Sequence, residues 1–138
     1  QRNVFGPGLL PWKWGRGAFG LVRNLTKNMF ALMEFRWAKA IGACVLLAIF
    51  GIGPFLGLAL APGWSRLPYA AAVACIALLY AGLTRKLRIS PLYFTLHPVG
   101  TLLLIYTMLR SMAHAARHRG VVWRGTRYSL EELRKGLV

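Results

Sequence analysis

The sequence predicts an all-α integral membrane protein, and three long uncharged runs are the basis for this prediction. Ala40 to Ser65 comprises 26 residues without a charged side chain, Leu67 to Thr84 comprises 18, and Ile89 to Leu109 comprises 21. A helix needs roughly 20 apolar residues to cross the hydrocarbon core of a bilayer. The composition agrees, since 57% of the residues are hydrophobic and only 15% are charged. We therefore expect about three transmembrane helices in a multi-pass protein of the cell membrane.

The spans divide the chain into three regions of a single domain. Residues 1–39 form a basic linker with an interfacial amphipathic helix, 40–112 form the three-span region, and 113–138 form a short basic C-terminal tail. The chain begins with Gln1, and its first apolar run starts far from that end, unlike a signal peptide. We expect the protein to continue upstream, which would make this chain a fragment.

The charge is strongly one-sided, because 18 Lys and Arg face three acidic residues and give a net charge of +15. The basic residues flank the apolar runs, where anionic lipid headgroups attract them. We therefore expect the lipid bilayer as the partner, and no nucleic acid. Seven basic residues before the first run and three after the second would lie on one side of a three-span protein, against eight on the other. The positive-inside rule then places the N-terminal side in the cytoplasm by a narrow margin.

The segment Ala18 to Trp37 is predicted to form one helix. Most of its apolar side chains fall on one half at 100° per residue, and Arg23, Lys27 and Glu34 fall on the other, while Phe35 and Arg36 break the pattern. A basic amphipathic helix just before a span is expected to lie in the membrane interface. The alternative is that its apolar face packs on another protein domain.

The spans carry their own markers. Pro54 should kink the first span, or divide it into two segments that form a re-entrant hairpin, which would return the tail to the cytoplasm. Gly53 and Gly57 have a spacing that allows close helix approach. The second span is rich in alanine, which predicts the middle helix of a tight hairpin.

Three histidines could carry function. An ionisable His97 at membrane depth is a functional hypothesis, but a neutral imidazole bonded to a carbonyl freed by Pro98 is favoured, because no span contains an acidic partner. His114 and His118 have a metal-compatible spacing. Since Arg117 and Arg119 would repel a cation, we expect a basic interfacial surface there instead.

The tail reads as a helix that stops at Gly120, a strand-like run over 121–128, and a short terminal helix. Ser129 and Glu132 have the spacing of a capping box. Leu130, Leu133 and Leu137 should share one side of the terminal helix.

The sequence supplies no catalytic set and no metal ligands. The acids are Glu34, Glu131 and Glu132, there is no Asp, and no phosphate-binding loop or dinucleotide fingerprint occurs. This chain alone is therefore not expected to be an enzyme.

Two stretches resemble membrane-bound family 2 glycosyltransferases. Residues 17–31, with the core Lys27-Asn28-x-Phe30-Ala31, resemble the segment that follows the catalytic domain. Residues 122–134, with Trp123-Arg124-Gly125-x-x-Tyr128, resemble the C-terminal tail. Hopanoid- and carotenoid-associated members and ceramide glucosyltransferase relatives are the nearest. Met33 stands where the polymerising members have the Gln of Q-x-x-R-W, which argues against that subgroup.

The resemblance implies a nucleotide-sugar domain upstream of Gln1, with a D-x-D motif, a catalytic Asp and bound Mg²⁺ or Mn²⁺. The whole enzyme would move a sugar from a nucleotide donor to a lipid acceptor at the cytoplasmic face. This region would anchor the enzyme and help to form the path by which the acceptor enters. The alternative is a small stand-alone basic membrane protein, or a complex subunit without catalysis.

The candidate contacts with the acceptor or with lipid headgroups are Lys27, Asn28, Trp123, Arg124 and Tyr128. We expect the aromatic tail strand to fold back against the interfacial helix near Lys27 and Asn28, because free tails are usually polar. Alternatively, Trp123 and Tyr128 are simple interface anchors and Arg124 contacts a headgroup.

Overall fold

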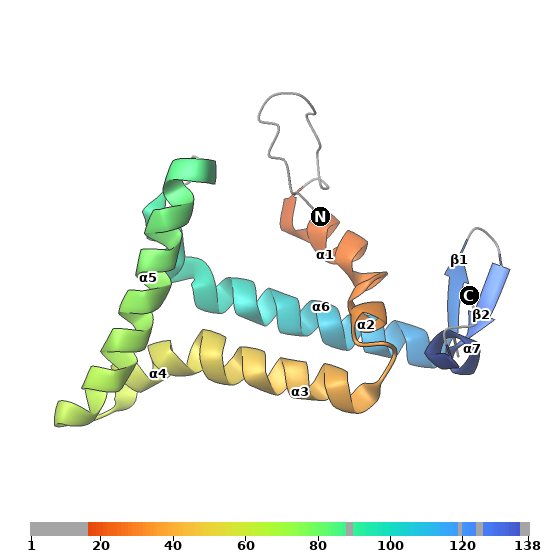
Figure 1. Ribbon diagram of the computed structural model, residues 1–138, viewed down its shortest axis with the longest axis horizontal. Helices are drawn as coiled ribbons and strands as arrows, with labels where there is room; N and C mark the ends of the chain where they lie inside the picture. The colour runs from red at the N-terminus through yellow and green to blue at the C-terminus, as the bar shows by residue number, and fades with distance from the viewer. Residues whose placement is uncertain (1–16, 88–89, 119, 124–125, 136–138) are drawn as a thin grey trace.

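The computed structural model describes residues 17–87, 90–118, 120–123 and 126–135. Within this part of the chain the structure is helical apart from one β-hairpin near the C-terminus (Figure 1). Three helical stretches are long and apolar enough to cross a membrane: Trp37–Leu60, Gly63–Thr84 and Pro91–Arg117. The predicted all-α class with three potential spans is confirmed, and the outer spans extend beyond the predicted limits of 40 and 112.

The segment before the first span is not the single helix that was predicted. It forms α1 (Gly17–Thr26) and α2 (Met29–Leu32), and the chain then turns before α3 begins at Trp37. Glu34 and Phe35 both have φ of 54°, a left-handed conformation that reverses the chain direction. The reversal lets Phe35 enter the core, where its ring meets Phe30 edge-on at 5.6 Å between centroids.

The first span is one continuous helical stretch. It consists of α3 (Trp37–Leu47), a π-helical turn (Ala48–Ile52) and α4 (Gly53–Leu60). The Gly53 N–H donates to the Ala48 carbonyl five residues back, one more than in an α-helix. This wider turn accommodates Pro54, which has no N–H to donate. The re-entrant hairpin considered for this run is therefore not formed.

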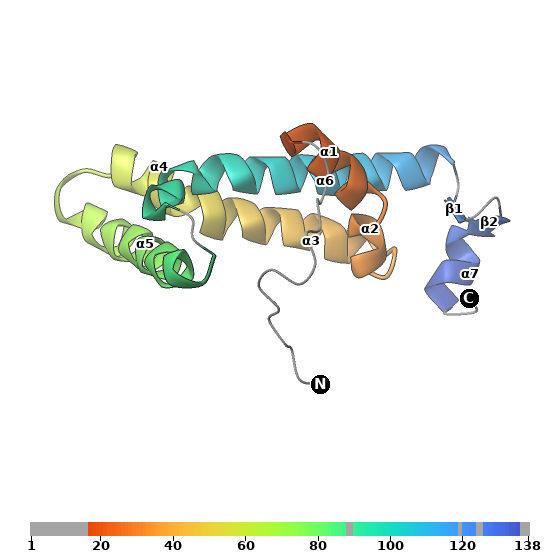
Figure 2. The same ribbon diagram turned by 90° about the horizontal axis from the view of Figure 1, so that it is seen from above.

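The third span returns beside the first. A 3₁₀ turn (Pro91–Leu96) leads into α6 (His97–Arg117), which runs antiparallel to α3 and α4 in both views (Figure 1, Figure 2). The helices approach closely at the buried Gly51, where a Cβ would lie 2.5 Å from the Thr101 Oγ1. The first span therefore begins, and the third span ends, at the end of the molecule where α2 lies.

The second span does not form the predicted tight hairpin. A 3₁₀ turn (Gly63–Arg66) leads into α5 (Leu67–Leu87), which lies steeply across the far ends of α4 and α6 (Figure 1). None of its most apolar 18-residue window is buried within the molecule. At the α4–α5 contact, the Tyr69 ring occupies the space beside Gly57, where a Cβ would come within 2.4 Å of the ring. The absence of a side chain at Gly57 thus leaves room for the Tyr69 ring at the contact between the two helices.

The hydrophobic core lies where α2, α3 and α6 meet, at the end opposite α5. Its buried members are Phe30, Phe35, Ala40, Cys44, Met108, Met112 and Ala115. The buried Phe30 N–H donates to the Ser111 Oγ at 3.0 Å. The interfacial segment is thus packed on the spans themselves.

The tail forms a hairpin where one strand was predicted. β1 (Gly120–Trp123) pairs antiparallel with β2 (Thr126–Ser129), and α7 (Leu130–Lys135) follows. Gly120 lies against the Tyr128 carbonyl, where a Cβ would be 2.1 Å from the oxygen. The capping box is confirmed, because the Ser129 N–H donates to Glu132 Oε2 at 2.8 Å and the Glu132 N–H donates to Ser129 Oγ at 3.2 Å.

Candidate membrane-interface site

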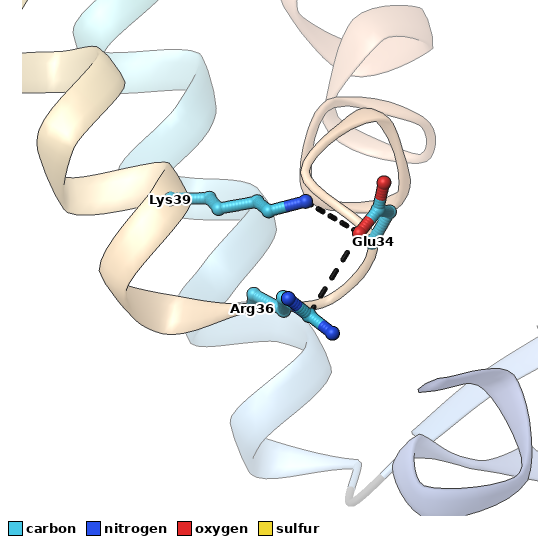
Figure 3. A network of polar contacts seen from close by, with 3 residues as sticks. All are labelled: Glu34, Arg36 and Lys39. Atoms are coloured by element: carbon cyan, nitrogen blue, oxygen red, sulfur yellow. Dashed lines mark hydrogen bonds and ion pairs between the residues drawn. The ribbon is translucent and has the colours of Figure 1, made fainter. Parts of the chain in front are cut away.

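The turn between α2 and α3 is held by ionic contacts. The Lys39 Nζ donates to Glu34 Oε2 at 2.5 Å, and the Arg36 Nε lies 3.7 Å from the same oxygen (Figure 3). The hydrogen bond from Lys39, together with its positive charge, lowers the pKa of Glu34 from its ordinary value. These contacts connect the first turn of α3 to the left-handed residue that reverses the chain.

Lys27 and Asn28 occupy the turn between α1 and α2, and both are exposed. The Asn28 N–H donates to the Leu25 carbonyl at 2.9 Å, and the Asn28 carbonyl accepts from the Leu32 N–H at 3.0 Å. The backbone polar groups of Asn28 thus join the two helices, and both side chains are accessible from outside.

Trp123 and Tyr128 lie on opposite strands of the hairpin, where Trp123 pairs with Thr126 and Tyr128 with Val121. Tyr128 is half-buried, and Arg124 lies outside the described residues. The hairpin extends past the C-terminal end of α6, whereas α1 lies over the middle of α6 in both views (Figure 1, Figure 2). The predicted fold-back of the strand onto the interfacial segment is therefore not seen. Instead α7 folds back, since Leu130 and Leu133 pack against the core.

His97 contacts a neighbouring span rather than a carbonyl freed by Pro98. Its Nδ1 lies 3.2 Å from the Tyr80 hydroxyl of α5, and its ring is stacked on Phe55 of α4 with centroids 6.2 Å apart. The expectation of a carbonyl partner is wrong in this respect. The His97 contacts join α4, α5 and the start of α6 at the far end of the molecule.

The His114 and His118 rings lie side by side at the end of α6, with centroids 4.3 Å apart and planes tilted by 37°. The His118 Nδ1 lies 2.9 Å from the His114 carbonyl. Within the part of the chain that the structure describes, no group of three or more His, Cys, Asp or Glu is placed to hold a metal ion. Arg110 and Arg117 lie on the same pocket as these rings. Sequence reasoning had not grouped them, although residues three, four and seven apart share a helix face.

Comparison with protein families, with curated proteins and with solved structures found no match to this chain.

Proposed function

We propose that this chain is the membrane-anchoring C-terminal region of a glycosyltransferase that moves a sugar from a nucleotide-sugar donor to a lipid acceptor. One observation carries the proposal. The two segments that resemble family 2 glycosyltransferases, 17–31 and 122–134, meet in one core at one end of the molecule. Phe30 of the first is a buried member of the core cluster, and Leu130 and Leu133 of the second pack against that cluster.

The charges of the segment before the first span support the proposal. Arg23 of α1, Lys27 in the turn after α1 and Arg36 directly before the span Trp37–Leu60 are exposed. Basic side chains suit a diphosphate or an anionic headgroup, and the apolar helices offer a surface to the tail of the acceptor. The catalytic domain, with its Mg²⁺ or Mn²⁺, would then be joined upstream of α1, next to this basic segment.

The decisive test is the open reading frame upstream of Gln1. We expect it to continue into a domain that carries a D-x-D motif. Membranes that contain the joined protein should then transfer a labelled sugar from a nucleotide donor to an extractable lipid. A start codon directly before Gln1, with no such domain joined to the chain, would contradict the proposal.

A second candidate is a stand-alone basic membrane protein or a complex subunit. It is favoured by the acids of the described chain, because Glu34 binds Lys39 and Glu132 caps α7. These contacts give the two carboxylates structural rather than catalytic roles. An antibody against α7 would distinguish the candidates, since a native membrane protein of about 15.4 kDa is expected only for this second one.

A further inference from the structure

A pocket of about 470 Å³ lies on the face of α6 that is turned away from the core. Its lining has two parts. Tyr106, Leu109 and Ala113 form an apolar part, and Arg110 and Arg117, with the His114 ring between them, form a polar part that carries two positive charges. His118 closes the same pocket at the end of α6. A pocket with both parts fits a ligand that is charged at one end and apolar at the other.

The two arginines act on the same space because of helix geometry. Residues seven apart are separated by about two turns and return to nearly the same face of an α-helix. Arg110 and Arg117 are both exposed, and His114 lies between them. The ion pairs of the described residues are formed by Glu34 with Arg36 and Lys39, at the turn before α3. Arg110 and Arg117 take part in neither of these two ion pairs.

The position of the pocket along α6 corresponds to a membrane interface. Met112 and Ala115 of α6 belong to the same core cluster as Ala40, in the first turn of α3. Trp37 and Lys39 of that turn are exposed at the same level. A level marked by Trp, Lys and Arg at the end of an apolar span is where lipid phosphates lie. The apolar part of the pocket then faces the acyl chains.

We propose that this pocket binds a phosphate-bearing anionic lipid from the adjoining leaflet. Arg110 and Arg117 hold the phosphate, since guanidinium groups bind phosphate oxygens through paired N–H donors. Tyr106, Leu109 and Ala113 hold the first part of an acyl chain. The inference goes beyond the proposed function, because it requires neither sugar transfer nor an upstream domain.

The test is titration of phosphatidylglycerol onto the purified protein in detergent, with bound lipid counted by native mass spectrometry. R110Q/R117Q should weaken binding about thirtyfold, because each basic residue near an anionic surface is worth roughly a factor of five. K39Q/R66Q is the matched control, since it removes the same charge from exposed positions outside the pocket. The control should keep affinity within about threefold, because salt largely screens exposed charges that lie away from the bound lipid. Circular dichroism confirms that each variant remains helical.

Two further experiments distinguish lipid binding in the pocket from general attraction to positive charge. A113L fills the apolar part without changing charge and should also weaken binding, and inorganic phosphate at the same concentration should not displace the lipid. Equal losses in both double variants, undiminished binding by A113L, or displacement by inorganic phosphate would each overturn the proposal.

Discussion

Ser111 joins two parts of the chain that are 81 residues apart. The other buried hydroxyls of α6 are used locally, since Thr101 donates to the His97 carbonyl and Thr107 to the Leu103 carbonyl. Ser111 instead accepts from Phe30, because α2 crosses α6 at this point and its first N–H groups have no partner within so short a helix.

Replacing Ser111 by alanine should therefore destabilise the protein by about 1–3 kcal/mol, because it leaves a buried N–H unsatisfied. Unfolding in detergent micelles, followed by circular dichroism, measures the change. Thr95→Ala is the control, since this exposed hydroxyl bonds only to the nearby Leu92 carbonyl, and its loss should stay within about 0.5 kcal/mol. A Ser111→Ala variant as stable as this control would show that the bond does not hold α2 on α6.

Glu34 predicts a pH dependence whose sign follows from its lowered pKa. The unfolded chain binds the proton more tightly, so this contact stabilises the fold above the ordinary pKa of the carboxyl. The contribution is lost as the pH falls through the lowered pKa. Carboxyl NMR titration should show the pKa of Glu34 rising toward its ordinary value in Lys39→Gln.

Glu132 is the internal reference for this titration, because its pKa is lowered by hydrogen bonds from the Ser129 backbone and side chain rather than by Lys39. It should titrate unchanged in Lys39→Gln. If the pKa of Glu34 stayed the same in Lys39→Gln, the hydrogen bond from Lys39 drawn in Figure 3 would not be the cause of its low value.

Among the elements, the packing of the first span on α6 depends on one glycine. Gly51→Ala should cost about 1–3 kcal/mol, since the new methyl group would overlap Thr101 in a closely packed contact. Gly42→Ala is the matched control in α3, because its Cβ would meet nothing within 4 Å. That change should stabilise the helix by up to about 1 kcal/mol.

A Thr101→Ala background makes the test specific, because it removes the two atoms nearest to the added methyl group. The cost of Gly51→Ala should shrink in this background. An equal cost in both backgrounds would mean that the two sites do not interact.

At the scale of the whole molecule, the arrangement of the spans predicts the membrane topology. Since α6 returns beside α3, both flanking segments meet the same end (Figure 1). Seven basic residues precede Ala40 and seven follow Leu109, whereas four lie between the spans. If the chain crossed three times, the numbers of basic residues on the two sides would differ only slightly. With both flanking segments on one side the numbers differ widely, and the positive-inside rule then predicts that this side is the cytoplasm. We expect α5 to lie obliquely at the far side without a full crossing.

Cysteine accessibility in sealed vesicles measures this topology, with Cys44 and Cys75 replaced by alanine. Asn24→Cys and Ala116→Cys should react with an impermeant reagent from the same side, and Ser65→Cys from the other, because all three positions are exposed. Reaction of Asn24→Cys and Ala116→Cys from opposite sides would require α5 to cross completely.

The sequence by itself determined the elements whose causes are local. Uncharged length gave the three potential spans, because a bilayer requires about 20 apolar residues whatever their neighbours are. The capping box at Ser129 and Glu132 was readable because both partners lie within one turn. The leucines at 130 and 133 were placed on one side by helical period alone.

Only the tertiary structure decided how these elements meet. The break in the amphipathic pattern at Phe35 does not by itself indicate that Glu34 and Phe35 adopt left-handed backbone conformations, since the gain comes from burying Phe35 against Phe30. The Ala-rich pattern of α5 suggested close packing in a hairpin, but α5 crosses the ends of α4 and α6 steeply, with the Tyr69 ring beside Gly57 at the contact. The pocket on α6 likewise depends on which face of this helix the core does not cover. These outcomes depend on contacts between residues far apart in the sequence, which local pattern does not contain.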